Sequence, residues 1–419
     1  MLKALYRSAS LRTAAAMGLG GIGFSLGSLL LARLLPTREY GIVALVLGIV
    51  AVAGLAAPLG LDQVIARRGM RLDAGWRRAA LSACATTALG AAMVAALVYH
   101  LSATVVASVA LSTLALGIAQ SAGGHFQGQQ RLRTAVWVVQ LLNGALALVA
   151  VLAALFGLSS AGAVCSWMAG VAIVAAAVVW WFVRRPGGGG RQPTPWGLRR
   201  EAISLLIVQS CSAGFMQLER LLLGPIVGLH DLAVYSVLAA LVSSPFRLLQ
   251  AAVQFTLIPT LHIAGGARAR RARVVREAAL VFGTVAAGSV AIWLLAPPLA
   301  HWLVAGRYTL THALIAAALV SGFLKIMSGF STAVVVSCGE ERRLRVLSFV
   351  CWGSIGISVA GAFLTGPWGL VGVLYGISAG WLVRFLLTSW LALPYLRESR
   401  QSAGPDVADG ARLRASGSR

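Results

Sequence analysis

Four basic residues lie inside long apolar stretches of the sequence, where a charged side chain is costly. They are Arg220, Arg247, Lys325 and Arg384. A charge at the centre of a bilayer costs at least about 2.5–3.5 kcal/mol on insertion scales, so an intramembrane cation is a candidate functional residue. Arginine binds phosphate through paired hydrogen bonds and stays charged in a partly dry site. We therefore expect these residues to line a cationic cavity that binds a phosphate group.

Snorkelling is the alternative for these cations. At roughly 1.5 Å of rise per residue, Arg247, Lys325 and Arg384 lie about 20–24 Å from the outer ends of their helices. From that depth a long side chain reaches the inner headgroups and binds no ligand. Trp381 and Trp390 flank Arg384 and are typical of an interfacial anchor. The sequence leaves both alternatives open.

Two acidic residues are candidates for ion coupling, because a carboxylate can take up a proton or a sodium ion during transport. Glu219 directly precedes Arg220, and Asp62 follows a Leu-Gly-Leu turn. Adjacent residues point in different directions on a helix, so Glu219 and Arg220 do not face the same way. They lie about 26 Å from the inner end of their helix, which predicts a position near the outer surface. An interface pair without a transport role is the alternative.

The first half of the chain offers neutral polar groups in place of buried cations. Gln140 and Asn143 are three residues apart and share one face of a helix. They are candidates for contacts with sugar hydroxyls. Hydrogen bonds between neighbouring helices are the alternative, and such bonds are common in membrane proteins.

Motifs for the common enzymatic reactions are missing from the sequence. The chain has no GxxxxGK[ST] phosphate loop, no HExxH and no GxSxG. Its five cysteines lie in apolar stretches without a CxxC pair, which indicates packing rather than metal ligation. We expect no enzymatic activity, no cofactor and no metal site.

The composition places these residues on membrane-spanning helices. Hydrophobic residues make up 58% and charged residues 11% of the 419 residues, which excludes a large soluble domain. A spanning helix needs about 20 apolar residues and satisfies its own backbone groups in lipid. The sequence predicts an all-α polytopic membrane protein with about twelve transmembrane helices, at residues 13–32, 40–61, 79–99, 103–122, 134–157, 162–183, 202–223, 234–258, 278–300, 309–333, 344–364 and 370–393.

Positive charge is distributed asymmetrically along these helices. A formal net charge of +23 would suggest nucleic-acid binding in a soluble protein. Most of the 35 Lys and Arg residues, however, lie at the termini and in the even-numbered loops, whereas the odd-numbered loops hold only Arg33, Arg38 and Arg307. Short loops rich in Lys and Arg stay in the cytoplasm. We therefore expect both termini to be cytoplasmic, and we expect no nucleic-acid partner.

A Gly- and Pro-rich stretch divides the chain into two halves. We expect an N-terminal six-helix bundle at residues 1–185, a cytoplasmic linker at 186–200, a C-terminal six-helix bundle at 201–396 and a disordered cytoplasmic tail at 397–419. The halves resemble each other, since LLLARLLPTREYGIVALVL (29–47) aligns with LLLGPIVGLHDLAVYSVLA (221–239). Repeats of this kind place substrate sites between the halves near the midplane.

Several segments resemble bacterial polysaccharide flippases of the Wzx type. They are LARLLPTREYGIVALVLGIVAVAGLAAPLGLDQVIARRG (31–69), FQGQQRLRTAVWVVQLLNGALALVAVL (126–152), LERLLLGPIVGLHDLAVYSVLAAL (218–241) and FLTGPWGLVGVLYGISAGWLVRFLL (363–387). The resemblance implies the MATE-like fold of the multidrug/oligosaccharidyl-lipid/polysaccharide (MOP) exporter superfamily, in which two six-helix bundles alternate between inward-open and outward-open states. The chain departs from many relatives at Pro58, where they have an acid, and places Asp62 beyond the turn.

The resemblance also implies a function and a location. Family members move undecaprenyl-pyrophosphate-linked oligosaccharide from the cytoplasmic to the outer leaflet of the inner cell membrane, for O-antigen or exopolysaccharide synthesis. A drug exporter with the same fold is the alternative, although cationic drugs favour acidic rather than basic residues in a cavity. A third alternative is an integral membrane enzyme or a protein that acts together with a polymerase. Expected partners are the lipid-linked oligosaccharide and membrane lipids, with a polysaccharide polymerase and a chain-length regulator as further candidates, and we expect a monomer.

Overall fold

The computed structural model describes residues 9–183 and 195–397, apart from 247–248, 251–252, 254–256, 258–260 and 262–265. The described residues form helices joined by short turns, with no strand among them. Three sequence predictions fall partly or wholly outside this part of the chain. They concern Arg247, most of the 186–200 linker and the tail after Arg397.

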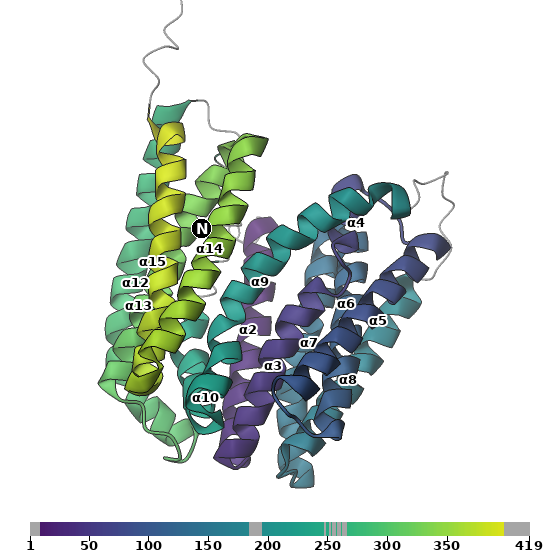
Figure 1. The fold of residues 1–419 in the computed structure, drawn as a ribbon, viewed down its shortest axis with the longest axis vertical. Coiled ribbons are helices and arrows are strands. Elements are labelled where there is room, and N and C mark those ends of the chain that lie inside the picture. The colour runs from purple at the N-terminus through teal and green to yellow at the C-terminus, as the bar shows by residue number, and fades with distance from the viewer. Residues whose placement is uncertain are drawn as a thin grey trace, which may run out of the picture.

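The first group of helices runs from α2 to α8 (Figure 1). Polar side chains begin two of these helices. The Asp73 carboxylate accepts a hydrogen bond from the Trp76 backbone N–H at 2.9 Å and starts α5. The Glu39 carboxylate accepts one from the Ala161 N–H at 2.6 Å and thereby joins α3 to the start of α8. The helices are α2 (Ala9–Leu34), α3 (Thr37–Ala56), α4 (Leu61–Arg68), α5 (Ala74–Leu97), α6 (Ala103–Gly128), α7 (Leu132–Phe156) and α8 (Ala161–Val183).

Helices α12 to α15 form a second group, and α9 crosses diagonally between the two groups (Figure 1). α9 ends at Val227, and Gly228 turns the chain directly into α10. The elements are η1 (Pro195–Leu198), α9 (Arg199–Val227), α10 (Leu229–Leu238), the π-helical turn η2 (Ala239–Ser243), α12 (Ala267–Leu303), α13 (His312–Cys338), α14 (Glu341–Thr365), η3 (Gly366–Trp368) and α15 (Gly369–Leu396).

The predicted fold class is confirmed at the level of an all-helical, multi-pass membrane protein with about ten to twelve spanning helices. Among the described residues, 10 helical stretches are long and apolar enough to cross a membrane. One of them, Arg342–Leu396, contains both α14 and α15. α2 adds a shorter apolar stretch at Gly20–Leu34.

Several helix boundaries differ from the sequence prediction, and two of the differences have a clear physical cause. The expected span 40–61 ends at Ala56, because Gly60 adopts a positive φ of 79° and starts the short helix α4. α12 begins at Ala267 rather than near residue 278. The first turns of α12 are rich in arginine. Apolar windows in the sequence identify only the membrane-spanning part of a helix, so they do not detect turns that extend beyond it.

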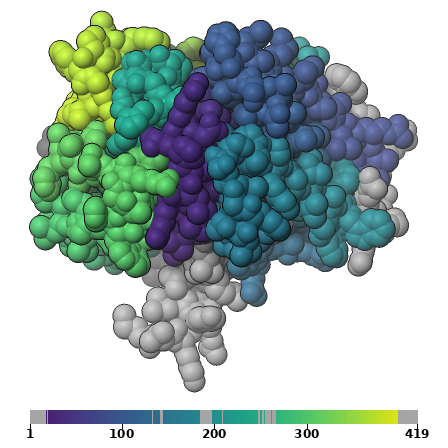
Figure 2. All heavy atoms as spheres, turned by 90° about the horizontal axis from the view of Figure 1, so that it is seen from below, coloured from purple at the N-terminus to yellow at the C-terminus, as the bar shows by residue number. Residues whose placement is uncertain are grey.

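At one end of the molecule the two groups are joined by contacts between loop and helix residues. Arg307 donates a hydrogen bond from Nη1 to the Leu35 carbonyl oxygen at 3.1 Å. The rings of Tyr40 and Tyr308 meet edge to face with centroids 6.2 Å apart. Viewed from this end, α2 lies between the green atoms of the second group and the blue atoms of the first (Figure 2). These contacts close this end of the molecule.

Candidate functional site

One face of α9 points towards the second group of helices. Cys211, Phe215 and Glu219 are four residues apart, so they lie along one side of the helix, and all three are buried. Phe215 stacks on Trp381 of α15, with ring centroids 3.9 Å apart and an interplanar angle of 4°. Glu219 forms an ion pair with Lys325 of α13. This face therefore attaches α9 to both α13 and α15.

The Glu219–Lys325 ion pair is almost completely enclosed by protein. Glu219 is 1% exposed and Lys325 is 4% exposed. The depths estimated from the sequence, with Glu219 near the outer surface and Lys325 inward of the midplane, cannot both hold, because the two side chains form an ion pair. α9 crosses the molecule diagonally (Figure 1), so its rise along the membrane normal is smaller than its length. α13 also begins three residues later than expected, at His312.

Arg384 of α15 lies against two aromatic rings. Its Cζ is 5.3 Å from the centroids of both Phe215 and Trp381, within the range of a cation–π interaction. The Lys325 Nζ is 5.5 Å from the same Trp381 ring. Trp381 is 1% exposed and Arg384 6% exposed. Trp381 is therefore no interfacial anchor, and burial argues against snorkelling of Arg384.

Arg220 lies on a different side of α9 from Glu219 and faces the first group. Its Cζ lies 5.2 Å from the Phe24 ring of α2, and its Nη1 donates to the Gln217 side-chain oxygen at 3.4 Å. The side chain of Arg220 also packs on Gly48 of α3, where an added methyl group would touch it. α9 thus presents a carboxylate to one group of helices and a guanidinium to the other.

We refer to Glu219, Lys325 and Arg384 as the buried charge cluster, whereas Arg220 lies on another face of α9. Two cations and one carboxylate leave a formal surplus of positive charge in this cluster. Within the described residues, the Arg384 Nε and the Trp381 Nε1 have no hydrogen-bond acceptor. A buried donor without an acceptor costs about 1–3 kcal/mol. An anion that enters the cluster would remove this penalty and neutralise the surplus charge.

Asp62 lies at the start of α4, outside the helices that are long enough to span. Its side chain is 2% exposed and accepts a hydrogen bond from the Gln63 side-chain amide at 2.9 Å. Burial raises the pKa of Asp62 to about 6, and hydrogen bonds from Gln63 and from Gln209 of α9 offset part of that rise. Asp62 therefore connects the first group to α9 through a carboxyl group that titrates close to neutral pH.

The remaining predicted site residues are not brought to the buried charge cluster by any described contact. Gln140 packs so closely against Gly20 of α2 that a methyl group on Gly20 would overlap the Oε1 atom of Gln140. This position fits helix–helix packing. The side chain of Asn143 and the whole of Arg247 lie outside the described residues.

The aromatic part of the site is not among the residues predicted from the sequence. Phe215 lies four residues before Glu219, and Trp381 lies three residues before Arg384. Each ring is therefore on the same helix face as a charged residue. This spacing between ring and charge is the sequence signal that could have identified Phe215 and Trp381. The tryptophan pattern alone, however, predicts that Trp381 lies at the membrane interface.

Solved structures of MATE transporters share this arrangement of helices. An inward-facing multidrug resistance MATE family transporter of the MOP superfamily is 16% identical, with a TM-score of 0.63 over 90% of this chain and 94% of that chain. An outward-facing one is 15% identical, with a TM-score of 0.58 over 93% and 97%. A MATE in complex with MaD3S is 17% identical, with a TM-score of 0.57 over 93% and 97%. The chain is thus a multi-pass membrane protein with the MATE-like fold.

The sequence also matches a protein family. Residues 30–278 match the model of the polysaccharide biosynthesis protein family. The matched region covers more than half of the chain, and the protein belongs to this family. The comparison with curated proteins found no match.

Proposed function

We propose that the protein translocates an undecaprenyl-pyrophosphate-linked oligosaccharide from the cytoplasmic to the outer leaflet by alternating access. Membership of the polysaccharide biosynthesis family supports a glycan precursor as the substrate. The buried charge cluster is the observation that carries the proposal, because its surplus positive charge suits a pyrophosphate. Such a protein moves its substrate without changing it chemically.

The charge of the cluster also supports an anionic substrate over the cationic substrate of a drug exporter. Cationic substrates need anionic partners. The single carboxylate of the cluster, Glu219, is already paired with Lys325, and Arg384 adds a further buried cation. The aromatic rings of the site, which could attract a cation, already lie against Lys325 and Arg384.

In this proposal Glu219 competes with the substrate for Lys325. Protonation of Glu219, or a sodium ion bound to it, would release Lys325 to a pyrophosphate oxygen. Return of the carboxylate to Lys325 would then help to expel the substrate at the outer side. Glu219→Gln should remove any proton or sodium dependence of transport. Asp62 is the second candidate for ion coupling, because it titrates close to neutral pH.

The test uses the purified full-length protein in vesicles that contain undecaprenyl-pyrophosphate with a fluorescent sugar. Translocation is measured by quenching from outside. Arg384→Ala should slow translocation about tenfold or more, since charge-assisted hydrogen bonds contribute about 1.5–3 kcal/mol. Arg276→Ala, which removes a guanidinium with a side chain 74% exposed, is the matched control and should leave the rate unchanged.

The same variants can be tested in cells. Arg384→Ala and Arg247→Ala should leave the protein inserted and should accumulate lipid-linked sugar on the cytoplasmic side. Normal surface polysaccharide in both single variants and in the double variant would contradict the cationic site. If Arg276→Ala slowed translocation in vesicles as much as Arg384→Ala does, the effect would come from the loss of any positive charge rather than from the buried charge cluster.

A further inference from the structure

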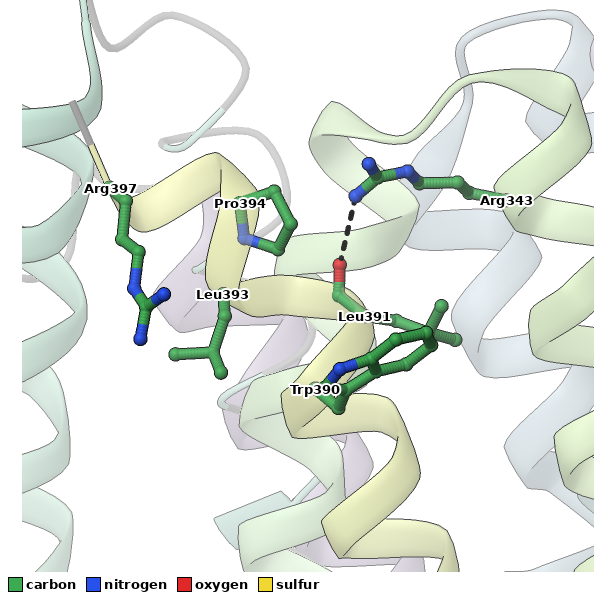
Figure 3. A pocket seen from close by; sticks show the side chains of 6 residues that line it. All are labelled: Arg343, Trp390, Leu391, Leu393, Pro394 and Arg397. Atoms are coloured by element: carbon green, nitrogen blue, oxygen red, sulfur yellow. Dashed lines mark hydrogen bonds between the residues drawn. The ribbon is translucent and has the colours of Figure 1, made fainter. Parts of the chain in front are cut away.

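A groove lies where α14 begins and α15 ends, away from the buried charge cluster. Its volume is about 560 Å³. Arg384 lies within α15 and Arg397 directly follows its last residue, Leu396, and the 13 positions that separate the two arginines correspond to about 20 Å. Figure 3 shows the six lining residues, which are Arg343 of α14 and Trp390, Leu391, Leu393, Pro394 and Arg397 at the end of α15.

The lining of this groove is apolar on one part and basic at its edge. Trp390, Leu393, Pro394 and Arg397 follow one another at spacings of three, one and three residues, so they share one face of α15. Trp390 is 68% exposed and Leu393 41% exposed. Arg397 follows the last helical residue, Leu396. The face therefore changes from apolar to cationic at the point where the helix ends.

Arg343 is held in position at the opposite side of the groove. Its Nη1 donates a hydrogen bond to the Leu391 carbonyl oxygen at 3.4 Å (Figure 3). Its Cζ lies 4.9 Å from the centroid of the Tyr395 ring. This hydrogen bond uses one of the five N–H donors of a guanidinium. In the described part of the chain, no ion pair is formed by Arg343 or by Arg397.

We propose that this groove binds one anionic phospholipid, with its phosphodiester between Arg343 and Arg397 and an acyl chain along Trp390 and Leu393. Two guanidinium groups without a carboxylate among the lining residues select a negative headgroup. A soluble phosphate would leave the apolar part of the groove unused. Basic pockets between spanning helices at the headgroup level bind anionic lipids for the same reason, and tryptophan is typical of that level.

The test is native mass spectrometry of the purified full-length protein with phosphatidylglycerol, phosphatidylcholine or glycerol phosphate added. We expect one tightly retained phosphatidylglycerol, weaker retention of phosphatidylcholine and no retention of glycerol phosphate. Each lost guanidinium should weaken phosphatidylglycerol binding about fivefold. Arg343→Gln/Arg397→Gln should therefore lose about 25-fold in affinity and bind both lipids alike.

Matched variants separate this site from general surface charge. Arg342→Gln and Arg345→Gln remove exposed arginines of the same helix that do not line the groove, and they should keep the preference for phosphatidylglycerol. Arg397→Gln alone changes an exposed residue beyond the helix and should fold normally while weakening binding. Unchanged preference in the Arg343→Gln/Arg397→Gln variant, or an equal loss in Arg342→Gln/Arg345→Gln, would overturn the proposal. Retention of glycerol phosphate would indicate a phosphate site without a lipid.

Discussion

Lys325 and Glu219 neutralise each other inside the protein, and both side chains are nearly inaccessible. Burying two charges costs solvation energy that their attraction repays only in good geometry, so such a pair is weak evidence for stability. Removing one partner is different, because it leaves a buried charge without compensation. A functional interpretation of the pair therefore has to be separated from its effect on stability.

A double-mutant cycle makes this separation. Glu219→Gln should destabilise the protein by up to about 3–5 kcal/mol, because it leaves Lys325 without its carboxylate. Glu219→Gln/Lys325→Met should recover most of that loss. The thermal unfolding midpoint of the purified protein in detergent measures both effects. Additive losses in the double variant would show that the two residues do not act as a pair.

Asp62 predicts a specific dependence of stability on pH. Its pKa of about 6 in the folded protein lies above the ordinary value of 3.8, so the folded state binds the proton more tightly than the unfolded state. The resulting stabilisation is present below about pH 4 and is lost as the pH rises through 6, by about 3 kcal/mol in total.

Asp62→Asn tests this dependence, since an amide cannot ionise. The variant should unfold at the same temperature as the unchanged protein at acidic pH and at a higher temperature at pH 7.5. If the unfolding temperatures of the two proteins differed by the same amount at every pH in this range, the raised pKa of Asp62 would be contradicted.

At the scale of elements, the first turn of α3 packs directly on the start of α10. The Gly41 backbone approaches the Leu229 carbonyl oxygen so closely that a Cβ atom would overlap it. The opposite end of the molecule has a different connection, in which Arg68 forms an ion pair with Glu201 at the start of α9 at 2.7 Å. α9 is therefore attached to the first group at its start and to α13 and α15 along its later turns.

Gly41→Ala tests the close packing of α3 on α10. The new methyl group cannot fit against the Leu229 backbone, so the substitution should lower the thermal unfolding midpoint or separate the two helices. Gly90→Ala on α5 is the matched control, because nothing lies within 4 Å of the position that its new methyl group would take, and removal of a helical glycine should stabilise by about 0.5–1 kcal/mol. An unchanged or raised unfolding midpoint in Gly41→Ala, with the two helices still in contact, would show that α3 does not depend on this close packing.

At the scale of the whole molecule, the two groups of helices meet at the end that contains Tyr40, Arg307 and Tyr308. The arginine-rich starts of α12 and α14 lie at the other end (Figure 1). If that second end is cytoplasmic, as the distribution of arginines predicts, the closed end faces outward. The alternating access that we propose would then require the Arg307–Leu35 and Tyr40–Tyr308 contacts to break. α9 must accommodate this movement, because it is attached to both groups.

Most of the helical architecture follows from the sequence, because runs of about 20 apolar residues must become helices in lipid. The same reasoning singled out Arg220, Lys325 and Arg384, since buried charge is recognisable wherever it interrupts such a run. Side-chain partners could not be read in this way. Glu219 and Lys325 are 106 positions apart, and their contact depends on the tilt of α9, which packing against neighbouring helices sets. The sequence therefore determined which charges enter the membrane, and only the tertiary structure decided that one carboxylate neutralises Lys325 while Trp381 and Phe215 hold Arg384.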